Sequence, residues 1–310
     1  MRVTIDNAGG CDGAAPSWQT SVTYCRQLES GHILFFPSAP VELPEDDCRF
    51  LLAQERAVAA MHKQVVYVPA ENRLAGVRTR DAAARARLRD VLRAYSRGVT
   101  RLVMEFLAPY AGALRVDYAS FRAQEEEGRP LRRRSRNDLL HTDAFPSRPT
   151  NGDRILRVFT NIHPTRPRRW VTAERFDRLL ASLADAPGLP LPGARGWRWR
   201  TRRALTALVR AAGLPVAVRS PYDDFMLRFH DFLKRNREFQ VACVKQVWDF
   251  PPRSTWIALT DALPHAAVSG QYALEQTFIV GREVMRLPET APINVLERLC
   301  GVVLSDPSAA

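Results

Sequence analysis

Three polar side chains from two distant parts of the sequence constrain the fold of this chain most. His141 and Asp143 form a His-x-Asp pair, and His265 lies downstream between two strand-like segments. Side chains two residues apart in an extended segment point to one face, so the pair presents an imidazole and a carboxylate together. Two imidazoles and one carboxylate on one side of an octahedral metal ion leave three positions open, as in non-heme Fe(II) oxygenases. We therefore expect a fold that brings these three residues to one iron ion.

The neighbours of the His-x-Asp pair support a buried site. The pair lies in the segment LLHTDAFP, residues 139–146, which is otherwise mostly apolar. A buried imidazole and a buried carboxylate need partners that offset their lost hydration, and a metal ion supplies one.

Elimination among the remaining histidines selects the third ligand. His163 follows the next strand too closely to return to the same ion, and His230 belongs to a helical apolar pattern in which packing is its expected role. His32 and His62 lie in the amino-terminal region. His265 remains: it follows the strand-like residues 254–260 and a turn, and it precedes the strand-like residues 271–280.

An arginine lies on one face of the strand predicted for residues 154–162. In this alternating segment Arg157 and Asn161 share a face, whereas Arg154 points to the opposite one. We expect the guanidinium of Arg157 to bind the distal carboxylate of 2-oxoglutarate and Asn161 to add a hydrogen bond at its chelating end, with Arg154 as second choice. The alternative is that Arg157 pairs with a structural acid.

Four runs of sequence resemble one family. The runs LHTDAFPS (140–147), RILRVFTNI (154–162), RSPYDDFML (219–227) and HAAVSGQYALEQTF (265–278) look like the 3-deoxy-D-manno-oct-2-ulosonic acid (Kdo) 3-hydroxylases. These are Fe(II)/2-oxoglutarate-dependent dioxygenases of Gram-negative bacteria. The likeness extends from about Gly31 to Gly301, and it implies the metal roles of His141, Asp143 and His265.

The resemblance also implies a fold and a reaction. The fold would be α+β, with a double-stranded β-helix (jelly-roll, cupin-like) core and flanking helices. The reaction would use Fe(II), 2-oxoglutarate and O2 to hydroxylate C3 of Kdo in the lipopolysaccharide inner core (Kdo-lipid A). It would give Ko, with succinate and CO2 as co-products, so the expected partner is a Kdo-containing lipid A precursor.

The chain departs from the wider superfamily at one point. Many members carry Arg or Lys on the strand after the distal histidine, whereas no residue from 266 to 281 is basic here. The carboxylate anchor must then come from the earlier strand, which favours Arg157. Gln271, Glu275 and Gln276 on the later strand are candidates for substrate contacts or for support of the site, although strand polar residues more commonly face solvent.

Length and composition predict a single domain. The 310 residues are 46% hydrophobic, which suits one Fe(II)/2-oxoglutarate dioxygenase domain over residues 18–305 with a helical insertion around 172–240. Residues 1–17 are predicted to be loose. No run of about eighteen apolar residues occurs and the first residues lack a secretory pattern, so we expect a cytoplasmic protein. The five scattered cysteines are expected to be reduced thiols.

The net charge of +12 comes from clustered arginines. They gather at residues 132–136, at 166–169, and at 198–203 beside Trp197 and Trp199. Such clusters suit the anionic surface of the inner membrane, where the protein would bind peripherally, and the phosphates of a lipid A precursor. Arg134, Arg219 and Gln271 are the expected substrate contacts. The alternative is that these arginines form a solvated surface with no binding partner. Nucleic-acid binding is not expected, because no nucleic-acid-binding fold signature accompanies the charge.

Local patterns predict several flanking elements. Short strands are expected at 32–36, 65–68 and 115–123. An arginine-rich helix is expected over 81–109, covering an edge of the outer sheet. Phe176, Leu179, Leu180 and Leu183 mark another helix. A further helix begins after Ser220, with Pro221 in its first turn and Asp223 completing a capping box.

Two other functions compete with this prediction. The first is a 2-oxoglutarate hydroxylase of a different small molecule or of a protein. The second is a non-catalytic β-barrel that binds anionic glycolipid, in which His141, Asp143 and His265 are hydrogen-bonded core residues.

Overall fold

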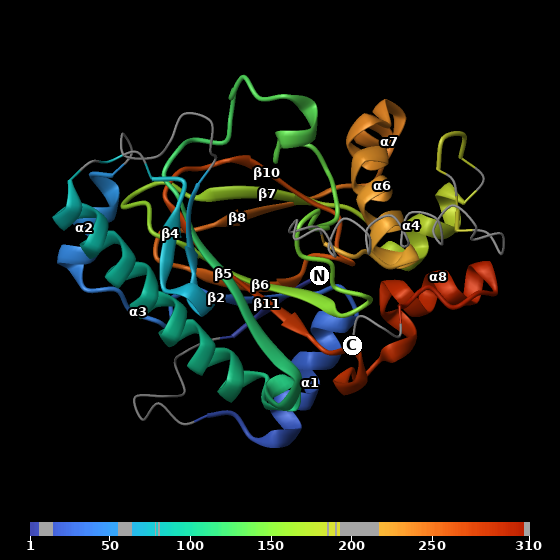
Figure 1. Cartoon of the computed structure of the whole chain (residues 1–310), viewed down its shortest axis with the longest axis horizontal. Coiled ribbons are helices and arrows are strands. Elements are labelled where there is room, and N and C mark those ends of the chain that lie inside the picture. The colour runs from blue at the N-terminus through green and yellow to red at the C-terminus, as the bar shows by residue number, and fades with distance from the viewer. Residues whose placement is uncertain are drawn as a thin grey trace, which may run out of the picture.

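Figure 1 shows the computed structural model of the chain, in which helices flank two β-sheets. The structure describes residues 1–5, 15–54, 64–77, 79, 81–184, 186–189, 191–192 and 217–306. In chain order the strands are β1 (Arg2–Thr4), β2 (Ile33–Phe36), β3 (Val65–Val68), β4 (Arg73–Ala75), β5 (Leu114–Arg122), β6 (Arg154–Asn161), β7 (Arg168–Thr172), β8 (Gln246–Phe250), β9 (Thr255–Leu259), β10 (His265–Ser269) and β11 (Ala273–Val280). The α-helices are α1 (Trp18–Glu29), α2 (Glu45–Leu52), α3 (Ala82–Phe106), α4 (Phe176–Leu183), α6 (Pro221–Arg235), α7 (Arg237–Ala242) and α8 (Pro292–Cys300).

The larger sheet has eight strands in the order β1-β2-β9-β6-β11-β5-β3-β4. Neighbouring strands are antiparallel, except that β1 is parallel to β2. Every residue of β6 and β11 is buried, as expected for central strands of a sheet that is covered on both faces. The strands predicted from alternation therefore form the centre of this sheet. Residues 1–17 were predicted to be loose, but residues 2–4 form the edge strand β1.

The smaller sheet has the order β10-β7-β8, and its strands are antiparallel. His141 forms a β-bridge with His265 at the start of β10, so the segment with the His-x-Asp pair runs beside this sheet. The two sheets face each other through aromatic rings. The ring centroids of Phe159 on β6 and Trp170 on β7 are 4.6 Å apart, and those of Trp170 and Trp256 on β9 are 5.5 Å apart.

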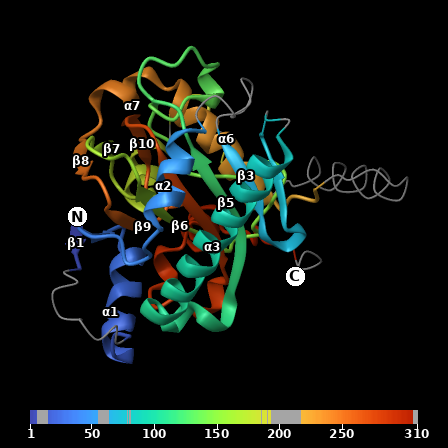
Figure 2. The same cartoon turned by 90° about the vertical axis from the view of Figure 1, so that its left-hand side faces the viewer.

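Helix α3 covers the opposite face of the larger sheet. The Asp81 carboxylate caps it by accepting hydrogen bonds from the backbone N–H groups of Ala83 and Ala84. Its buried apolar residues recur every three or four positions and share one core with Leu156 and Val158 of β6. The helix was expected to cover a sheet edge; it lies instead on the sheet face, because its apolar stripe is long enough to meet several strands (Figure 2).

Helices α4, α6 and α8 form a second apolar layer beside the metal segment. Helix α6 begins with the predicted capping box: Ser220 accepts a hydrogen bond from the Asp223 N–H, and the Asp223 carboxylate accepts one from the Ser220 N–H. Phe225 and Phe229 of α6 and Phe176 of α4 share this layer with Leu140, the residue before His141. The helical segment between β7 and β8 therefore packs directly behind the His-x-Asp pair.

No helix among the described residues combines the length and the apolar character that a membrane crossing requires. Cys25, Cys48, Cys243 and Cys300 are free thiols.

Candidate metal centre

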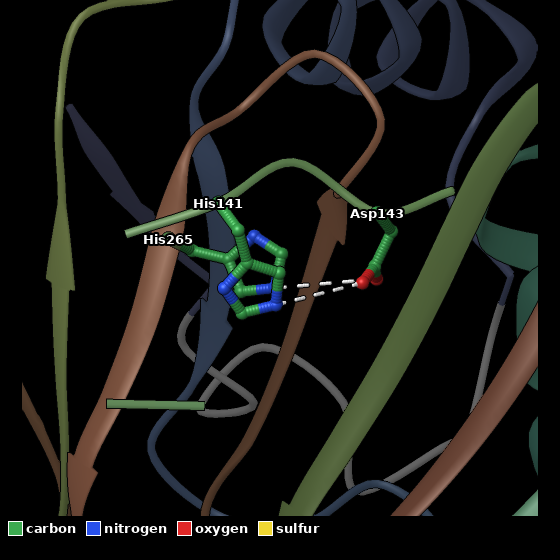
Figure 3. A group of neighbouring side chains, drawn as sticks. All are labelled: His141, Asp143 and His265. Carbon is green, nitrogen blue, oxygen red and sulfur yellow. Dashed lines mark ion pairs between the residues drawn. The ribbon is translucent and has the colours of Figure 1, made fainter. Parts of the chain in front are cut away.

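The fold brings His141, Asp143 and His265 together. The backbones of the two histidines exchange hydrogen bonds of 3.1 and 2.9 Å, which places their side chains next to each other. The Asp143 N–H donates to the Thr260 carbonyl at 2.9 Å, so its side chain lies on the same side two residues later. The Nε2 atoms of His141 and His265 lie 3.9 and 4.0 Å from the Asp143 carboxylate oxygens (Figure 3). One candidate ligand atom from each residue lies within 4.8 Å of the others.

Both imidazoles are oriented for metal binding through Nε2. The Nδ1 atom of His141 contacts the Leu139 carbonyl oxygen at 2.7 Å, and that of His265 contacts the Leu263 carbonyl oxygen at 2.9 Å. A carbonyl oxygen only accepts hydrogen bonds, so Nδ1 carries the proton in both rings and Nε2 keeps its lone pair. Hydrogen bonding of the distal nitrogen is the usual way in which proteins orient a histidine ligand.

Burial and neighbouring charges set the protonation states that a metal ion requires. Burial lowers the pKa of His141 well below its ordinary value and also lowers the pKa of His265. Burial alone would raise the pKa of Asp143, but the positive charge of Arg157 outweighs it and holds that pKa well below its usual range. The site therefore presents two neutral imidazoles and one carboxylate, the forms in which these groups bind metals.

Buried ion pairs surround the triad. Arg157 donates to Asp143 at 2.9 Å and pairs with Glu275 on its other side, and Glu275 also pairs with Arg122. Arg168 donates to Glu126 at 3.0 Å. Burial alone would raise the pKa of Glu275, but Arg122 and Arg157 lower it to about 2. The residues that line the cavity at the triad are Arg122, Asn137, His141, Asp143, Arg157, Phe159, Arg168, Trp170, His265, Ala267 and Glu275.

Guanidinium groups outnumber carboxylates in this cluster. Arg122, Arg157 and Arg168 pair with Asp143, Glu126 and Glu275. Arg129 also pairs with Glu126, so four guanidinium groups share three carboxylates. A divalent metal ion would add to this excess of positive charge. The Nε–H groups of Arg157 and Arg168 are buried and have no hydrogen-bond partner among the described residues. Buried donors of this kind need an acceptor, so the cluster suits an anionic ligand.

Aromatic rings hold the two histidines from outside. The Trp170 ring stacks on His265, with centroids 5.0 Å apart and planes at 17°. The His230 ring meets His141 edge-on at 4.9 Å, and its Nδ1 atom lies 2.7 Å from the Thr142 carbonyl oxygen. The packing role expected for His230 therefore places it against a metal-ligand candidate.

Of the three residues predicted to bind the cosubstrate, only Arg157 lines the cavity. The Asn161 amide donates to the carbonyl oxygens of Arg166 and Phe250 at 3.0 Å each. It therefore connects the backbone segments that contain these two residues. Arg154 is fully buried on the opposite face of β6, where its Nε atom donates to Asp261 at 2.6 Å. Strand alternation explains why Arg154 is separated from Arg157, since odd and even positions of β6 serve different layers. Asn161 shares a face with Arg157, but it lies at the end of β6, where its amide binds two backbone carbonyl oxygens instead of lining the cavity.

The three predicted substrate contacts also lie outside the cavity lining. Arg134 pairs with Asp231 of α6, its Nε atom donating at 3.0 Å. Arg219 donates to the Pro146 carbonyl oxygen at 3.0 and 2.7 Å. Gln271 accepts a hydrogen bond from Arg166 at 3.1 Å.

Sequence reasoning missed three charged residues around the triad, namely Arg122, Glu126 and Arg168, and it left the role of Glu275 open. Arg168 had been grouped with a surface cluster of arginines. In β7, however, Arg168 shares a face with Trp170, whereas the intervening Arg169 points outward to Asp249. Strand alternation around Trp170 was the signal that could have separated these two arginines.

A buried set of two histidines and one carboxylate between two β-sheets defines a candidate non-heme iron centre. The family model for 3-deoxy-D-manno-oct-2-ulosonic acid (Kdo) hydroxylase matches residues 13–303, and the chain belongs to this family. No curated protein sequence matches the chain.

Solved structures of the Kdo hydroxylase KdoO, a non-heme Fe(II) alphaketoglutarate-dependent dioxygenase, are similar to the chain. The complex with succinate and Fe(III) is 32% identical, has a TM-score of 0.84, and covers 99% of this chain and 98% of that one. The complex with alphaketoglutarate and Fe(III) has the same identity and TM-score and covers 100% and 98%. The complex with cobalt(II) has a TM-score of 0.85 at 32% identity and covers 99% and 98%.

Proposed function

We propose that this protein is an Fe(II)/2-oxoglutarate-dependent dioxygenase that hydroxylates C3 of Kdo in a Kdo-containing lipid A precursor. The observation that carries the proposal is the triad itself. Two neutral imidazoles, each with a proton-free Nε2 atom, and one ionised carboxylate lie beside buried arginines whose Nε–H groups have no hydrogen-bond partner among the described residues. Membership of the Kdo hydroxylase family and the similarity to KdoO supply the substrate class.

We further propose that the two sheets form a double-stranded β-helix within one domain over residues 18–305. Strands near one another in sequence alternate between the sheets: β5 and β6 belong to the larger sheet, and the His141 segment between them runs beside the smaller one. Strands β9 and β11 of the larger sheet likewise enclose β10 of the smaller one. This alternation is the topology by which a jelly-roll closes two sheets over one core.

Within the cavity, Arg157 is the proposed anchor for the distal carboxylate of 2-oxoglutarate, and Arg168 is its neighbour. Glu275 pairs with Arg157 and Arg122, and so holds both guanidinium groups at the cavity wall. The fixed fork of a guanidinium suits a carboxylate better than an ammonium would. Iron would be held by His141, Asp143 and His265.

When bound, iron and 2-oxoglutarate would allow O2, the oxidant, to hydroxylate a C–H bond. One oxygen atom would enter the hydroxyl group and the other would enter succinate, as 2-oxoglutarate is oxidised and releases CO2. The protein's own residues bind, orient and exclude water. Hydrogen bonds from Nδ1 fix the two imidazoles, and Arg157 keeps Asp143 ionised. Trp170 and Phe159 form an apolar wall beside His265.

The proposed site of action is the cytoplasmic face of the inner membrane, where the protein would bind peripherally. The exposed arginines at 132–134 support this proposal, because anionic headgroups and the phosphates of a lipid A precursor attract such clusters. The Trp-Arg cluster at 197–203 lies outside the described residues.

The test is succinate release from 2-oxoglutarate with added Fe(II), in the presence and absence of a Kdo-bearing lipid A precursor, with mass spectrometry of the glycolipid. We expect turnover that depends on the glycolipid and one added oxygen on Kdo. Asp143→Ala should abolish both, whereas Asp249→Ala, which alters an exposed carboxylate paired with Arg169, should retain them. Turnover without glycolipid oxidation would exclude the proposed substrate, and no turnover at all would exclude the oxygenase.

A further inference from the structure

The end of α7, the turn after it and the start of β8 expose three apolar side chains. Val241, Val244 and Val247 are 72%, 76% and 60% exposed, and all three lie within seven residues. We call these three residues the valine tip. Isolated exposed apolar residues are common in proteins, but three of them within one short stretch of chain indicate an interaction surface.

Basic side chains outnumber acidic ones beside the valine tip. The Lys245 ammonium lies 2.5 and 3.3 Å from the carbonyl oxygens of Gln240 and Val241, which fixes it at the end of α7. Arg235 and Arg237 are exposed on the preceding turns together with Glu238, and Arg235 pairs with Asp231. Asp249, which follows Val247 on β8, is exposed and pairs with Arg169. Apolar side chains with cations at their margin are the pattern of proteins that enter the headgroup layer of an anionic bilayer.

A second basic segment lies at the same end of the molecule. Arg132, Arg133 and Arg134 are exposed in the loop after β5, and this loop is joined to α6 by the ion pair between Arg134 and Asp231. The Lys234 ammonium also donates to the Arg134 carbonyl oxygen at 3.1 Å. Both views place α7 and this loop at one end of the molecule (Figures 1 and 2).

The base of the valine tip contacts the metal segment. The side chain of Gln240 in α7 accepts a hydrogen bond from the Leu140 N–H at 3.0 Å and donates one to the Leu140 carbonyl oxygen at 2.9 Å. Leu140 immediately precedes His141, so these two hydrogen bonds connect α7, at the base of the valine tip, to the metal-ligand candidate. Val244 also lines an open groove of about 1090 Å³ between α4 and the α6–α7 pair, together with Phe232 and Phe239.

We propose that the valine tip and the cations around it form the surface by which the protein docks on an anionic lipid bilayer. The valines enter the headgroup layer, while the basic side chains pair with phosphates. This proposal rests on the proposed function in one respect: the protein needs to reach a bilayer because the bilayer holds its glycolipid substrate. Docking at this surface brings the bilayer to the side of the molecule on which α6 and α7 support the His141 segment.

The test compares two substitutions at equally exposed valines. Val244→Asp alters the valine tip, and Val303→Asp is the matched control, because Val303 is also 76% exposed but lies after α8. Cosedimentation would use vesicles of equal parts phosphatidylcholine and phosphatidylglycerol, and vesicles of phosphatidylcholine alone. We expect the wild-type protein to bind the mixed vesicles. Val244→Asp should weaken this binding at least about tenfold, whereas Val303→Asp should leave it within about twofold.

Three results would overturn the proposal: no binding of the wild-type protein to mixed vesicles, equal binding by the two variants, or binding that does not depend on phosphatidylglycerol. Sedimentation velocity tests a protein partner instead. A wild-type dimer that Val244→Asp converts to monomer, with vesicle binding unchanged, would assign the surface to a second copy of the chain. Matching thermal unfolding of the two variants establishes that both are folded.

Activity measurements separate this proposal from the proposed function. On a deacylated, water-soluble Kdo sugar, both variants should match the wild-type protein, whereas Val244→Asp should slow reaction of the glycolipid embedded in mixed vesicles. If no variant and no wild-type sample oxidises any Kdo compound, the proposed function fails, while the vesicle result still decides the docking surface.

Discussion

At the residue scale, Arg157 has two acidic neighbours, and these explain how one guanidinium can both form ion pairs and bind a ligand. It contacts Asp143, which it keeps ionised, and it pairs with Glu275, which fixes it at the cavity wall. The two interpretations of Arg157 from sequence, cosubstrate anchor and partner of a structural acid, are therefore compatible. Its Nε–H group has no hydrogen-bond partner within the part of the chain that the structure describes, so it can donate to a carboxylate.

Replacement of Arg157 by Leu is predicted to weaken 2-oxoglutarate binding at least about 100-fold, which corresponds to about 2.7 kcal/mol. Metal binding should persist, because the three ligands remain. Isothermal titration with Co(II), followed by 2-oxoglutarate, measures both affinities. Arg169→Leu is the control, since Arg169 lies next to Arg168 on β7 but pairs with Asp249 at the surface. Normal cosubstrate affinity in Arg157→Leu would transfer the anchor to Arg168.

The buried histidines predict a pH dependence of stability. Burial lowers the pKa of His230 to about 4 and also lowers the pKa values of His141 and His265. The unfolded chain has these imidazoles near their ordinary pKa of about 6.5, so between about pH 6.5 and 4 it binds more protons than the folded protein. Stability of the metal-free protein should therefore fall as the pH drops through this window. The contribution of Glu275, whose pKa is lowered to about 2, is lost only at lower pH.

Urea unfolding at a series of pH values tests this dependence. Each buried histidine contributes a slope of up to about 1.4 kcal/mol per pH unit. His230→Gln should reduce the total slope by up to that amount, because glutamine does not titrate. An unchanged slope in this variant would mean that His230 is protonated in the folded protein.

At the element scale, short local patterns were the most reliable predictors. The Ser220 capping box and the apolar stripes of α3 and α4 depend on contacts within one or two turns of chain, and the structure confirms all of them. Which part of the larger sheet α3 covers depends on the whole sheet. The prediction that α3 covers an edge of the sheet was wrong, because it packs on a face.

The two members of the capping box should differ in their effect on stability. Ser220→Ala is predicted to lower the free energy of unfolding by about 1 kcal/mol, the usual loss of an N-cap. Asp223→Ala should cost more, because its carboxylate also accepts hydrogen bonds from the N–H groups of Thr150 and Asn151 at 2.8 and 3.1 Å. Ser182→Ala, which removes a hydroxyl bonded only within its own helix, is the control and should change stability by less than about 0.5 kcal/mol. Equal losses for Ser220→Ala and Asp223→Ala, measured by urea unfolding, would contradict this prediction.

At the scale of the whole molecule, the chain crosses from the smaller sheet to the larger one in a turn that lies against a site residue on β7. Gly270, between β10 and β11, has a φ of +119°, and a Cβ atom there would lie 2.9 Å from the Arg168 Cα atom. Its carbonyl oxygen accepts a hydrogen bond from Arg168 at 2.9 Å. Glycine is required here both by the positive φ and by this approach.

Gly270→Ala is therefore predicted to cost about 2 kcal/mol or more and to weaken 2-oxoglutarate binding by displacing Arg168. Gly128→Ala is the control: Gly128 also has a positive φ, of +69°, but nothing lies within 4 Å of its Cβ position. It should cost about 1 kcal/mol and leave the ligand affinity unchanged. Urea unfolding and titration with 2-oxoglutarate measure the two effects. Similar results for both variants would show that the approach to Arg168 carries no functional weight.

The sequence alone determined which residue types carry the chemistry and which face of a strand each one occupies. The spacing of His141 and Asp143, the elimination that left His265, and the opposite faces of Arg154 and Arg157 all follow from local periodicity. Only the tertiary structure decided which charges meet. Arg122, Glu126, Arg168 and Glu275 surround the triad because strand register joins segments far apart in the chain. The alternation within one strand fixes the face on which a side chain lies, but it does not name the partner strand, which depends on how the two whole sheets pack.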